Sequence, residues 1–195
     1  MHGWHKPFGG ANSSHQQGLL RDNELGGAYN GGTIFKITAS GALTTLYSFC
    51  AQASCTDGAY PYAGLVQGTD GNFHGTTYSG GAFTSTDCPN GCDTVFKIAP
   101  KGPLTTLHSF DGSDGFGPRA GLIQANHGDF YGTTEFGGDN NAGTVFRMTP
   151  DGTLSTIHSF CAFEECSDGY GPWAGLIQGS DGYFYGTTYH GGPTS

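Results

Sequence analysis

The segment AGLIQGSDGYFYGTT at residues 174–188 decides the fold, because close copies of it occupy residues 63–77 and 120–134. The three copies begin 57 and 54 residues apart. Two further motifs, GTVFRMT at 143–149 and LSTIHSF at 154–160, each recur three times in the same order. The other copies of GTVFRMT lie at 32–38 and 93–99, and those of LSTIHSF lie at 43–49 and 104–110. Self-similarity at a nearly fixed period is typical of a repeat architecture.

Each repeat predicts four short strands joined by tight turns. GTVFRMT and LSTIHSF are rich in β-branched and aromatic residues, which favour strands, and the PDG between them is a turn signal. The GSDG at 179–182 joins AGLIQ to YFYGTT in the same way. Phe146 and Met148 point to one face of their strand and Val145 to the other, so both faces need cover. Four-stranded sheets of this length, packed face to face around an axis, are the blades of a β-propeller.

We therefore expect an all-β fold, a β-propeller-like array of four-stranded antiparallel blades with about three repeats. AGLIQ supplies the first strand of a blade, YFYGTT the second, GTVFRMT the third and LSTIHSF the fourth. A ring usually has about four to eight blades, so we expect a partial ring that missing repeats or a homo-oligomer would complete. A β-solenoid is the alternative fold. The expected divisions are an irregular N-terminal segment or degenerate half repeat at 1–25, and a repeat domain at 26–192 made of a half blade at 33–49, blades at 63–110 and 120–160, and a half blade at 174–189.

The composition excludes several function classes. The chain has 195 residues, of which 36 are glycine, and a formal net charge of −9. A nucleic-acid partner normally requires a basic face, so none is expected. No apolar stretch is long enough to span a membrane. Residues 1–17 have no apolar core of the kind that a secretory signal peptide contains.

The motifs resemble the tandem repeat of the GloVer (Gloeo/Verruco) family, whose pattern runs roughly AGLIQGSDGNLYGTTYYGG and then GTVFKLTPSGTLTTLYSF. The resemblance covers about residues 26–192. It implies a bacterial surface or secreted protein, often with a separate C-terminal anchor, and it implies no enzyme activity and no catalytic residues. The chain shows neither a signal peptide nor an anchor. This departure favours a fragment of a larger propeller with no autonomous function as one alternative.

Connections of variable length are expected to share one face of the array. In an up-and-down meander alternate connections fall on the same side, and the turns after the first and third strands hardly vary. Phe110 and Asp114 are four residues apart, whereas the corresponding pairs in the other two repeats are eight apart. Gly138 and Thr144 are six residues apart, whereas the corresponding pair in the preceding repeat is thirteen apart. Variable loops on a rigid scaffold commonly carry binding residues, so we place the candidate site on this variable-loop face.

The variable-loop face is expected to be acidic, with Arg119 as the one basic residue placed there. An acidic face attracts a cation or a basic partner, or it serves as a solubilising surface. Asp57, Asp114 and Asp168 recur in every copy, which favours a role in capping the loop through backbone hydrogen bonds. The DGSDG at 111–115 supplies fewer oxygens than Ca²⁺ needs, so calcium is the less favoured hypothesis and no cofactor is expected. The acids placed on this face are Asp57, Asp87, Asp93, Asp111, Asp114, Asp139, Glu164, Glu165 and Asp168.

Aromatic residues stand beside these acids in the loop motif DGxxPxAGL. The residue after the proline changes from Tyr62 to Arg119 to Trp173 along the chain. Rings that stack on a sugar and acids that bind its hydroxyl groups favour a polysaccharide partner, and a protein surface is the other expected partner. The alternative is that these rings pack between blades. The candidate binding residues are Tyr60, Tyr62, Phe116, Arg119, Tyr170, Trp173, Asp111, Asp114, Glu164, Glu165 and Asp168.

The sequence predicts a non-catalytic binding scaffold. It contains no GxSxG, HExxH or phosphate-loop motif. His108 and His158 stand where the first repeat has Tyr47, which indicates a packed, hydrogen-bonded ring rather than a catalytic base. The alternative is a carbohydrate-active propeller enzyme that uses loop carboxylates, such as Glu165 with Asp168, since glycosidases use two carboxyl groups.

Cysteines occur in pairs, and each pair accompanies additional loop residues. The middle repeat has the short loop at 110–114 and no cysteine in it. A metal site would need four ligands in one place, and a redox pair would more often have two intervening residues. We expect three local disulfides, which favour an oxidising compartment and hence a secreted or cell-surface protein. The expected pairs are Cys50 with Cys55, Cys88 with Cys92, and Cys161 with Cys166.

Overall fold

The computed structural model describes residues 26–192, which consist almost entirely of strands and loops. The segment 1–25, expected to be irregular or a degenerate half repeat, lies outside the described residues, as do residues 193–195. Helix in the described range is limited to two single-turn 3₁₀ segments, η1 (Ala53–Cys55) and η2 (Glu164–Cys166). Neither is long and apolar enough to cross a membrane. The all-β prediction is confirmed.

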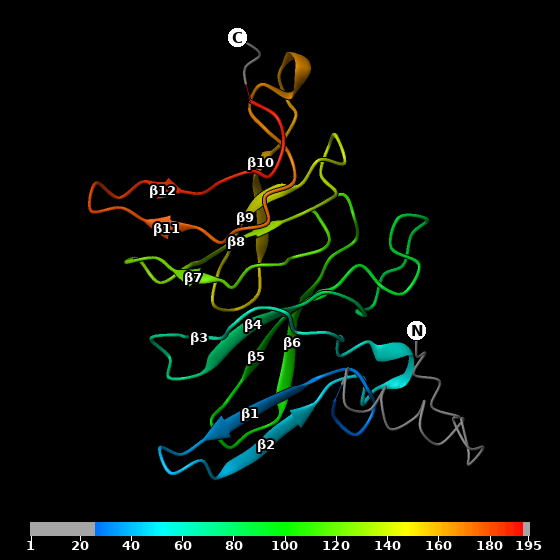
Figure 1. Cartoon of the computed structure of the whole chain (residues 1–195), viewed down its shortest axis with the longest axis vertical. Coiled ribbons are helices and arrows are strands. Elements are labelled where there is room, and N and C mark those ends of the chain that lie inside the picture. Colours follow the sequence, from blue (N-terminus) through cyan, green and yellow to red (C-terminus); the bar gives the residue numbers. More distant parts are fainter. Residues whose placement is uncertain (1–25, 193–195) are drawn as a thin grey trace, which may run out of the picture.

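The strands of residues 26–192 form four antiparallel sheets (Figure 1). Two sheets have four strands, in the orders β3-β4-β5-β6 and β7-β8-β9-β10, and the other two are the pairs β1-β2 and β11-β12. Each four-stranded sheet is a meander of consecutive strands, which differs from the parallel coils of a β-solenoid. The strands are β1 (Thr33–Ile37), β2 (Leu43–Ser48), β3 (Val66–Gln67), β4 (Phe73–Thr77), β5 (Thr94–Ile98), β6 (Leu104–Ser109), β7 (Ile123–Gln124), β8 (Phe130–Thr134), β9 (Thr144–Met148), β10 (Leu154–Ser159), β11 (Ile177–Gln178) and β12 (Phe184–Tyr185).

The first strand of each sheet is shorter than the AGLIQ motif predicts. β3, β7 and β11 contain two residues each. The alanine–glycine–leucine residues before them lie against the neighbouring repeat. A Cβ atom on Gly121 would stand 3.1 Å from the carbonyl oxygen of Gly64, so glycine permits the two chain segments to approach this closely.

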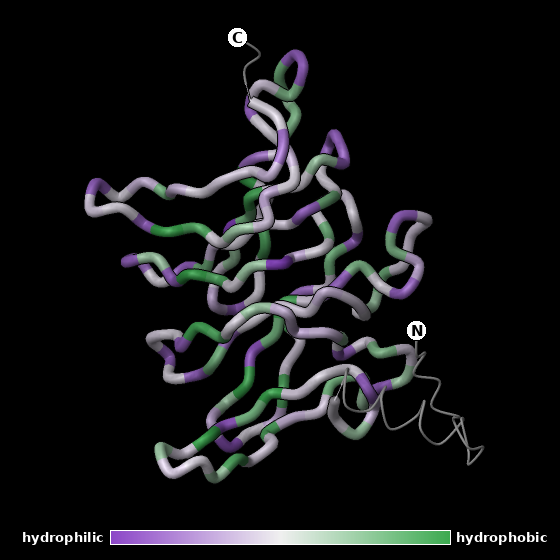
Figure 2. The backbone as a smooth tube through the Cα atoms, viewed as in Figure 1, coloured by the Kyte–Doolittle hydropathy of each residue, from purple (hydrophilic) through white to green (hydrophobic). Residues whose placement is uncertain are grey.

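Successive sheets pack face to face through aromatic rings. The ring centres of Phe49 and Phe96 are 5.0 Å apart, between the first and second sheets. Those of Phe110 and Phe146 are 5.4 Å apart, between the second and third. Val95 and Phe96 point to opposite faces of β5, and both are fully buried. Hydrophobic stretches follow the strands through the middle of the stack (Figure 2). The predicted cover on both faces is confirmed for β5, whereas Val145 of β9 is only partly buried.

The two outer sheets leave equivalent side chains exposed. Phe35 of β1 corresponds to Phe96 of β5, yet Phe35 is 54% exposed and Phe96 is fully buried. Tyr185 of β12 is 50% exposed, and its equivalent Tyr131 in β8 is buried. Within residues 26–192 the four sheets form an open stack without a closed barrel (Figure 1).

Candidate binding face

The connections that enter each sheet lie against the connections that leave its second strand. Isolated backbone bridges join the two kinds of loop in three successive repeats. The two variable connections therefore meet on one side of the stack. The bridged pairs are Ala59 with Ser79, Phe116 with Phe136, and Tyr170 with His190. The variable-loop face comprises residues 49–65, 78–93, 110–122, 135–143, 160–176 and 189–192.

The six cysteines of the described chain form three disulfides, with the pairing that the sequence predicts. Each disulfide closes a ring within a single loop of the variable-loop face, and none of these cysteines is free. The Cα atoms are 4.0 Å apart in the pairs Cys50–Cys55 and Cys161–Cys166, and 5.0 Å apart in the pair Cys88–Cys92.

The first and third disulfide loops share one backbone conformation although their sequences differ, CAQASC against CAFEEC. Ser54 and Glu165 have φ angles of 55° and 54°, and Cys55 and Cys166 both have φ of 52°. In each loop the glycine three residues later donates its N–H to the carbonyl of the second cysteine at 2.8 Å. The same frame therefore presents different side chains in the two repeats.

The recurring aspartate of the first loop is fully buried. Asp57 accepts hydrogen bonds from the Tyr47 hydroxyl at 2.7 Å and from the backbone N–H groups of Ala51 and Gln52 at 3.0 and 3.1 Å. Burial and the bond to Asp57 raise the pKa of Tyr47 above its usual value. The aspartate thus fixes the loop from inside, as the sequence predicts.

A histidine replaces the tyrosine in the next two repeats. His108 Nε2 lies 2.6 Å from an Asp114 carboxylate oxygen, and His158 Nε2 lies 3.1 Å from an Asp168 carboxylate oxygen. Both aspartates also accept backbone N–H groups of their own loops. The prediction that these imidazoles are hydrogen-bonded, partly buried rings is confirmed. Asp114 and Asp168 serve mainly to hold the loops.

The acidic surface is smaller than expected. Asp57 and Asp93 lie in loops of this face as predicted, but they are 0% and 2% exposed and therefore contribute no exposed acidic surface. Asp57 caps its loop, and the Asp93 carboxylate accepts a hydrogen bond from the N–H of Gly117. The acids that do face solvent are Asp87, Asp111, Asp139, Glu164 and Glu165.

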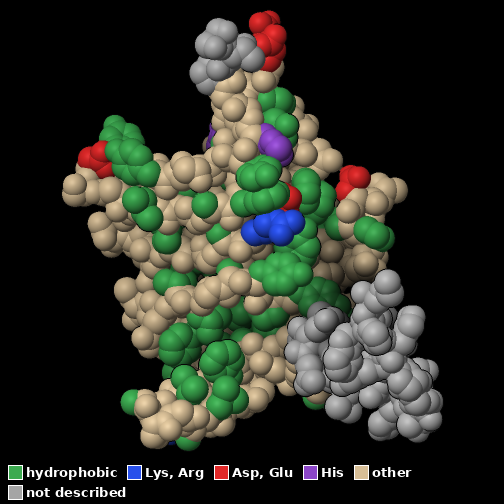
Figure 3. Space-filling view, in the orientation of Figure 1, with side chains coloured by type: hydrophobic (Ala, Val, Ile, Leu, Met, Phe, Trp, Pro, Cys, Tyr) green, Lys and Arg blue, Asp and Glu red, His purple; other side chains and the backbone are tan. Residues whose placement is uncertain are grey.

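Five side chains form a continuous column across three repeats. The ring centres of Tyr62 and Tyr78 are 5.0 Å apart. The guanidinium carbon of Arg119 lies 4.9 Å from the ring centre of Tyr78 and 5.0 Å from that of Trp173. Trp173 and Tyr189 stack with centres 4.0 Å apart and planes 10° apart. We call these five residues the aromatic column. Figure 3 shows a basic side chain with hydrophobic side chains on either side of it on this face.

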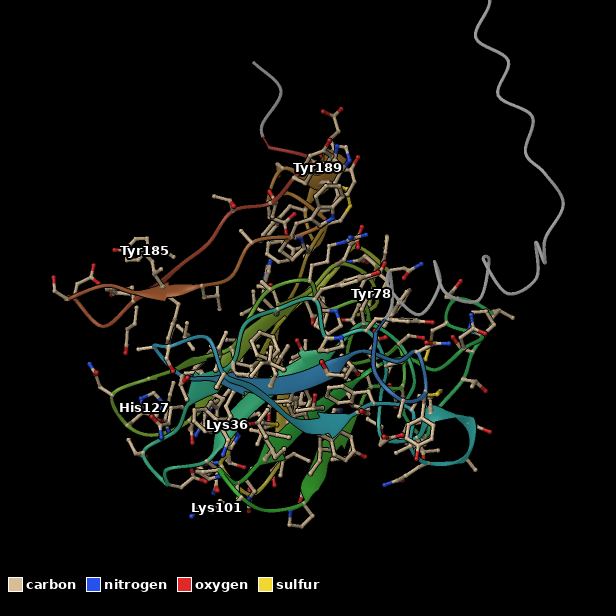
Figure 4. All side chains as sticks on the ribbon, turned by 60° about the horizontal axis from the view of Figure 1, so that its bottom comes forward. Lys36, Tyr78, Lys101, His127, Tyr185 and Tyr189 are labelled. Atoms are coloured by element: carbon tan, nitrogen blue, oxygen red, sulfur yellow. A yellow bond between two sulfur atoms is a disulfide. The ribbon has the colours of Figure 1, made fainter. Side chains whose placement is uncertain are left out.

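Arg119 is held in the column by a buried carboxylate. Its Nε donates to Glu135, which is 5% exposed, and its Nη2 lies 3.2 Å from the Tyr78 hydroxyl. The hydrogen bond to Glu135 raises the pKa of Arg119 further, while burial raises the pKa of Tyr78. Tyr62 and Tyr189, at the two ends of the column, are 63% and 60% exposed. Tyr78 and Tyr189 lie apart from Lys101, which is in the turn between β5 and β6 (Figure 4).

The remaining candidate residues lie beside the column rather than in it. Phe116 stacks on Phe136 with ring centres 5.2 Å apart, and Tyr170 stacks on His190 at 4.8 Å. Tyr60 has a φ of 58°, and its N–H donates a hydrogen bond to the carbonyl of Gly31 at 2.7 Å. Tyr60 belongs neither to the aromatic column nor to these two stacked pairs.

The candidate acids lie at loop tips. Asp111 accepts the hydroxyl and the N–H of Ser113, and these bonds hold the pKa of Asp111 below its usual value. Glu164 and Glu165 form the exposed tip of the third disulfide loop. The structure therefore groups Tyr62, Arg119 and Trp173, but it does not bring the acids to them.

The sequence prediction lacks two of the five column residues, Tyr78 and Tyr189, and the carboxylate of Glu135 that holds Arg119. Tyr78, Glu135 and Tyr189 directly follow the GTT of each repeat. A signal was present, because this position changes together with the residue after the proline. An aromatic residue accompanies an aromatic one in two repeats, and Glu135 accompanies Arg119 in the other.

The face offers rings, one guanidinium group and exposed carboxylates. Within residues 26–192 no three His, Cys, Asp or Glu side chains are grouped so that they could hold a metal ion. This chemistry suits non-covalent association with a partner surface.

The family model of the Gloeobacter/Verrucomicrobia repeat matches residues 5–195. The chain belongs to this repeat family. The match begins inside the segment 1–25, so it extends further than the resemblance found from the motifs. No curated protein matches the chain. In this Gloeobacter/Verrucomicrobia repeat protein the column lies at repeat positions whose residue type changes from one copy to the next, whereas the strand motifs hardly change.

Proposed function

We propose that the protein is a non-catalytic repeat scaffold that binds a protein partner through the variable-loop face, in a secreted or cell-surface setting. The observation that carries this proposal is the aromatic column. Tyrosine, tryptophan and arginine are the residue types that dominate binding hot spots between proteins. Here they form one contiguous row with Arg119 in the middle, between Tyr78 and Trp173, and with well exposed tyrosines at its two ends.

The stacking within the column favours a protein over a glycan. Trp173 is contacted by Tyr189 at 4.0 Å and by Arg119 at 5.0 Å. Because two groups cannot occupy one face of a ring, these contacts leave mainly its edge for a partner. A sugar ring stacks on a free aromatic face, and the ends of the column at Tyr62 and Tyr189 are exposed enough to offer one. A glycan is therefore the second candidate partner.

The absence of catalysis is part of the proposal. Asp114 and Asp168 are hydrogen-bonded to histidines and to loop N–H groups, which supports a structural role for both. The secreted or cell-surface setting is supported by three disulfides, since these persist in oxidising compartments.

The stacked sheets are proposed to be blades of a propeller-like array. The two-stranded outer sheets expose Phe35 and Tyr185, whose equivalents are buried in the four-stranded sheets. A further sheet packed against each end, from another part of a longer protein or from a second copy, would cover them. The mass of the chain in solution separates these sources, because a second copy would double it.

The binding proposal is tested with the whole chain on a peptide array and a glycan array. Trp173→Ala and Tyr62→Ala are expected to weaken binding about tenfold or more. Tyr183→Ala is the matched control, because Tyr183 is 71% exposed but lies in the turn between β11 and β12, away from the column. Peptide binding that depends on Trp173 supports the proposal, whereas binding to glycans alone selects the second candidate. Hydrolysis of a polysaccharide that Glu165→Gln or Asp168→Asn abolishes would overturn the non-catalytic assignment.

A further inference from the structure

The middle repeat contains a cavity beside the aromatic column. It has a volume of about 220 Å³ and lies between the insertion at 82–92 and the loop around Phe116. Three aromatic side chains and two carboxylates contribute to its lining. Among the lining residues are Tyr78, Asp87, Asp93, Phe116 and Phe136.

Asp93 departs from the repeat at a position where the other copies have glycine. Gly32 and Gly143 have φ angles of 90° and 98°, and Asp93 has a φ of 87°. Only glycine adopts this conformation without strain. Asp93 is also 2% exposed, so its carboxylate is both buried and attached to a strained backbone. The insertion at 82–92 and the aspartate in place of glycine occur together in the same repeat, so this site differs from its equivalents in both loop length and charge.

Part of the role of Asp93 is structural. In the flanking repeats the N–H groups of Tyr60 and Gly171 bond the backbone carbonyls of Gly31 and Ala142. In the middle repeat the equivalent N–H, that of Gly117, bonds the Asp93 carboxylate instead. A carboxylate has more acceptor sites than a backbone carbonyl, and it carries a charge. One hydrogen bond from Gly117 leaves that charge without a cationic partner.

The buried charge is not neutralised within the described chain. Among residues 26–192 no lysine, arginine or histidine forms an ion pair with Asp93, and Arg119 pairs with Glu135 instead. Burial raises the pKa of Asp93 to about 7, and only the Gly117 N–H opposes that rise. A buried carboxylate of this kind is best compensated by a cation that enters the cavity.

We propose that this cavity binds an organic cation, namely the ammonium or guanidinium group of a basic side chain on the protein partner. This inference rests on the proposed function and adds the chemistry of the partner. The rings of Phe116 and Phe136 line the cavity and can attract a cation, and Asp93 supplies the opposite charge. Exposed Asp87, which lines the same cavity, strengthens the local negative potential. A hard metal ion fits less well, because it needs about six oxygen ligands and the lining is largely aromatic.

The test uses small probes on the whole chain. N-acetyl-lysine methylamide and N-acetyl-arginine methylamide are titrated by isothermal calorimetry and by NMR, with N-acetyl-norleucine methylamide as the neutral probe of similar shape. The two cations are expected to bind with dissociation constants of about 1 mM, a level at which a tenfold change is measurable. The norleucine probe is expected to show no saturable binding.

Variants at Asp93 complete the test. Asp93→Gly restores the residue of the other repeats, and Asp93→Asn keeps the shape without the charge; both are expected to weaken cation binding about tenfold or more. Asp139→Asn, an exposed acid on the same face, is the matched control. Circular dichroism establishes that the variants are folded. Equal binding of norleucine and lysine probes, or unchanged lysine binding by Asp93→Gly, overturns the inference.

The two proposals fail in different ways. Peptide binding that depends on Trp173 but not on Asp93 overturns the cation site alone. Probe binding that depends on Asp93, in a chain whose peptide binding is unaffected by Trp173→Ala, overturns the role of the aromatic column alone.

Discussion

The guanidinium carbon of Arg119 lies 5.0 Å from the ring centre of Trp173, and this contact joins two consecutive repeats. The two residues occupy the same position in their repeats, directly after a proline. Arg119 also contacts Tyr78 of the preceding sheet at 4.9 Å. One side chain therefore links three repeats on the face proposed to bind a partner.

Arg119→Ala is expected to lower the free energy of unfolding by about 1–3 kcal/mol, because buried Glu135 loses its charged partner. Arg119→Trp combined with Glu135→Tyr recreates the pair found in the third repeat and is expected to recover most of that loss. Urea unfolding of the single and double variants measures the coupling between the two positions. Strictly additive effects of the two changes would contradict the pairing.

Equivalent phenylalanines are expected to differ sharply in their contribution to stability. Phe96→Ala removes a fully buried ring and should cost about 3–5 kcal/mol. Phe35→Ala, at the same position of an outer sheet with the ring 54% exposed, should cost about 1 kcal/mol or less. Denaturant unfolding of the two variants makes the comparison. Equal losses would show that the outer face of β1 is covered in solution.

The non-reduced protein is expected to contain no free thiol and to weigh six hydrogens less than the reduced chain, since three disulfides form. Replacing Cys50 and Cys55 together by serine should lower stability by about 2 kcal/mol, as the chain-entropy account predicts for a short ring. Thiol titration with intact mass spectrometry, followed by thermal unfolding, checks both statements. Reaction of native thiols with the titrant would refute the pairing.

The stability of the protein is expected to fall with rising pH through the titration of Asp93. The folded chain holds the Asp93 proton with a pKa of about 7, against the ordinary value of 3.8 in the unfolded chain. The folded state therefore binds more protons between these values, and the penalty grows from about pH 4 to about pH 7. At about 1.4 kcal/mol for each unit of pKa difference, the total reaches at most about 4 kcal/mol.

The matching control is Asp93→Asn, whose stability should lack this component of the pH profile. Tyr78 and Asp87 line the same cavity, and the Arg119–Glu135 pair lies nearby. Because these titratable groups are the same in the unchanged chain and in Asp93→Asn, their contribution cancels in the comparison. The difference between the two unfolding profiles, measured from pH 4 to pH 8, isolates Asp93. A constant difference across this range would argue against a perturbed carboxyl group.

The repeated motifs predict the strands and the turns because β-branched and aromatic residues alternate with short turn signals in three copies. They also predict that Asp57 and its equivalents cap the loops, since an aspartate present in every copy suits a shared backbone role. The first strands are shorter than predicted, and beside them Gly121 approaches Gly64 in a contact between repeats that no single repeat encodes.

The burial of Asp93 was equally hidden from sequence reasoning. An aspartate directly after a long insertion suggests a surface position, and only the folded loop brings the N–H of Gly117 to its carboxylate. Three of the five residues in the aromatic column can be predicted from the sequence. Tyr62, Arg119 and Trp173 were recognised by their variation, whereas Tyr78 and Tyr189 belong to a different segment of the chain, and the fold alone places them alongside.

The shared frame of the first and third disulfide loops has a consequence for how such a protein diversifies. CAQASC and CAFEEC close with nearly the same backbone angles, although one presents Gln52, Ala53 and Ser54 and the other presents Phe163, Glu164 and Glu165. Each ring is closed within its own connection and takes no part in strand pairing. The loop therefore accepts different side chains on one backbone frame, and its sequence can change without altering the strand pairing of the sheets.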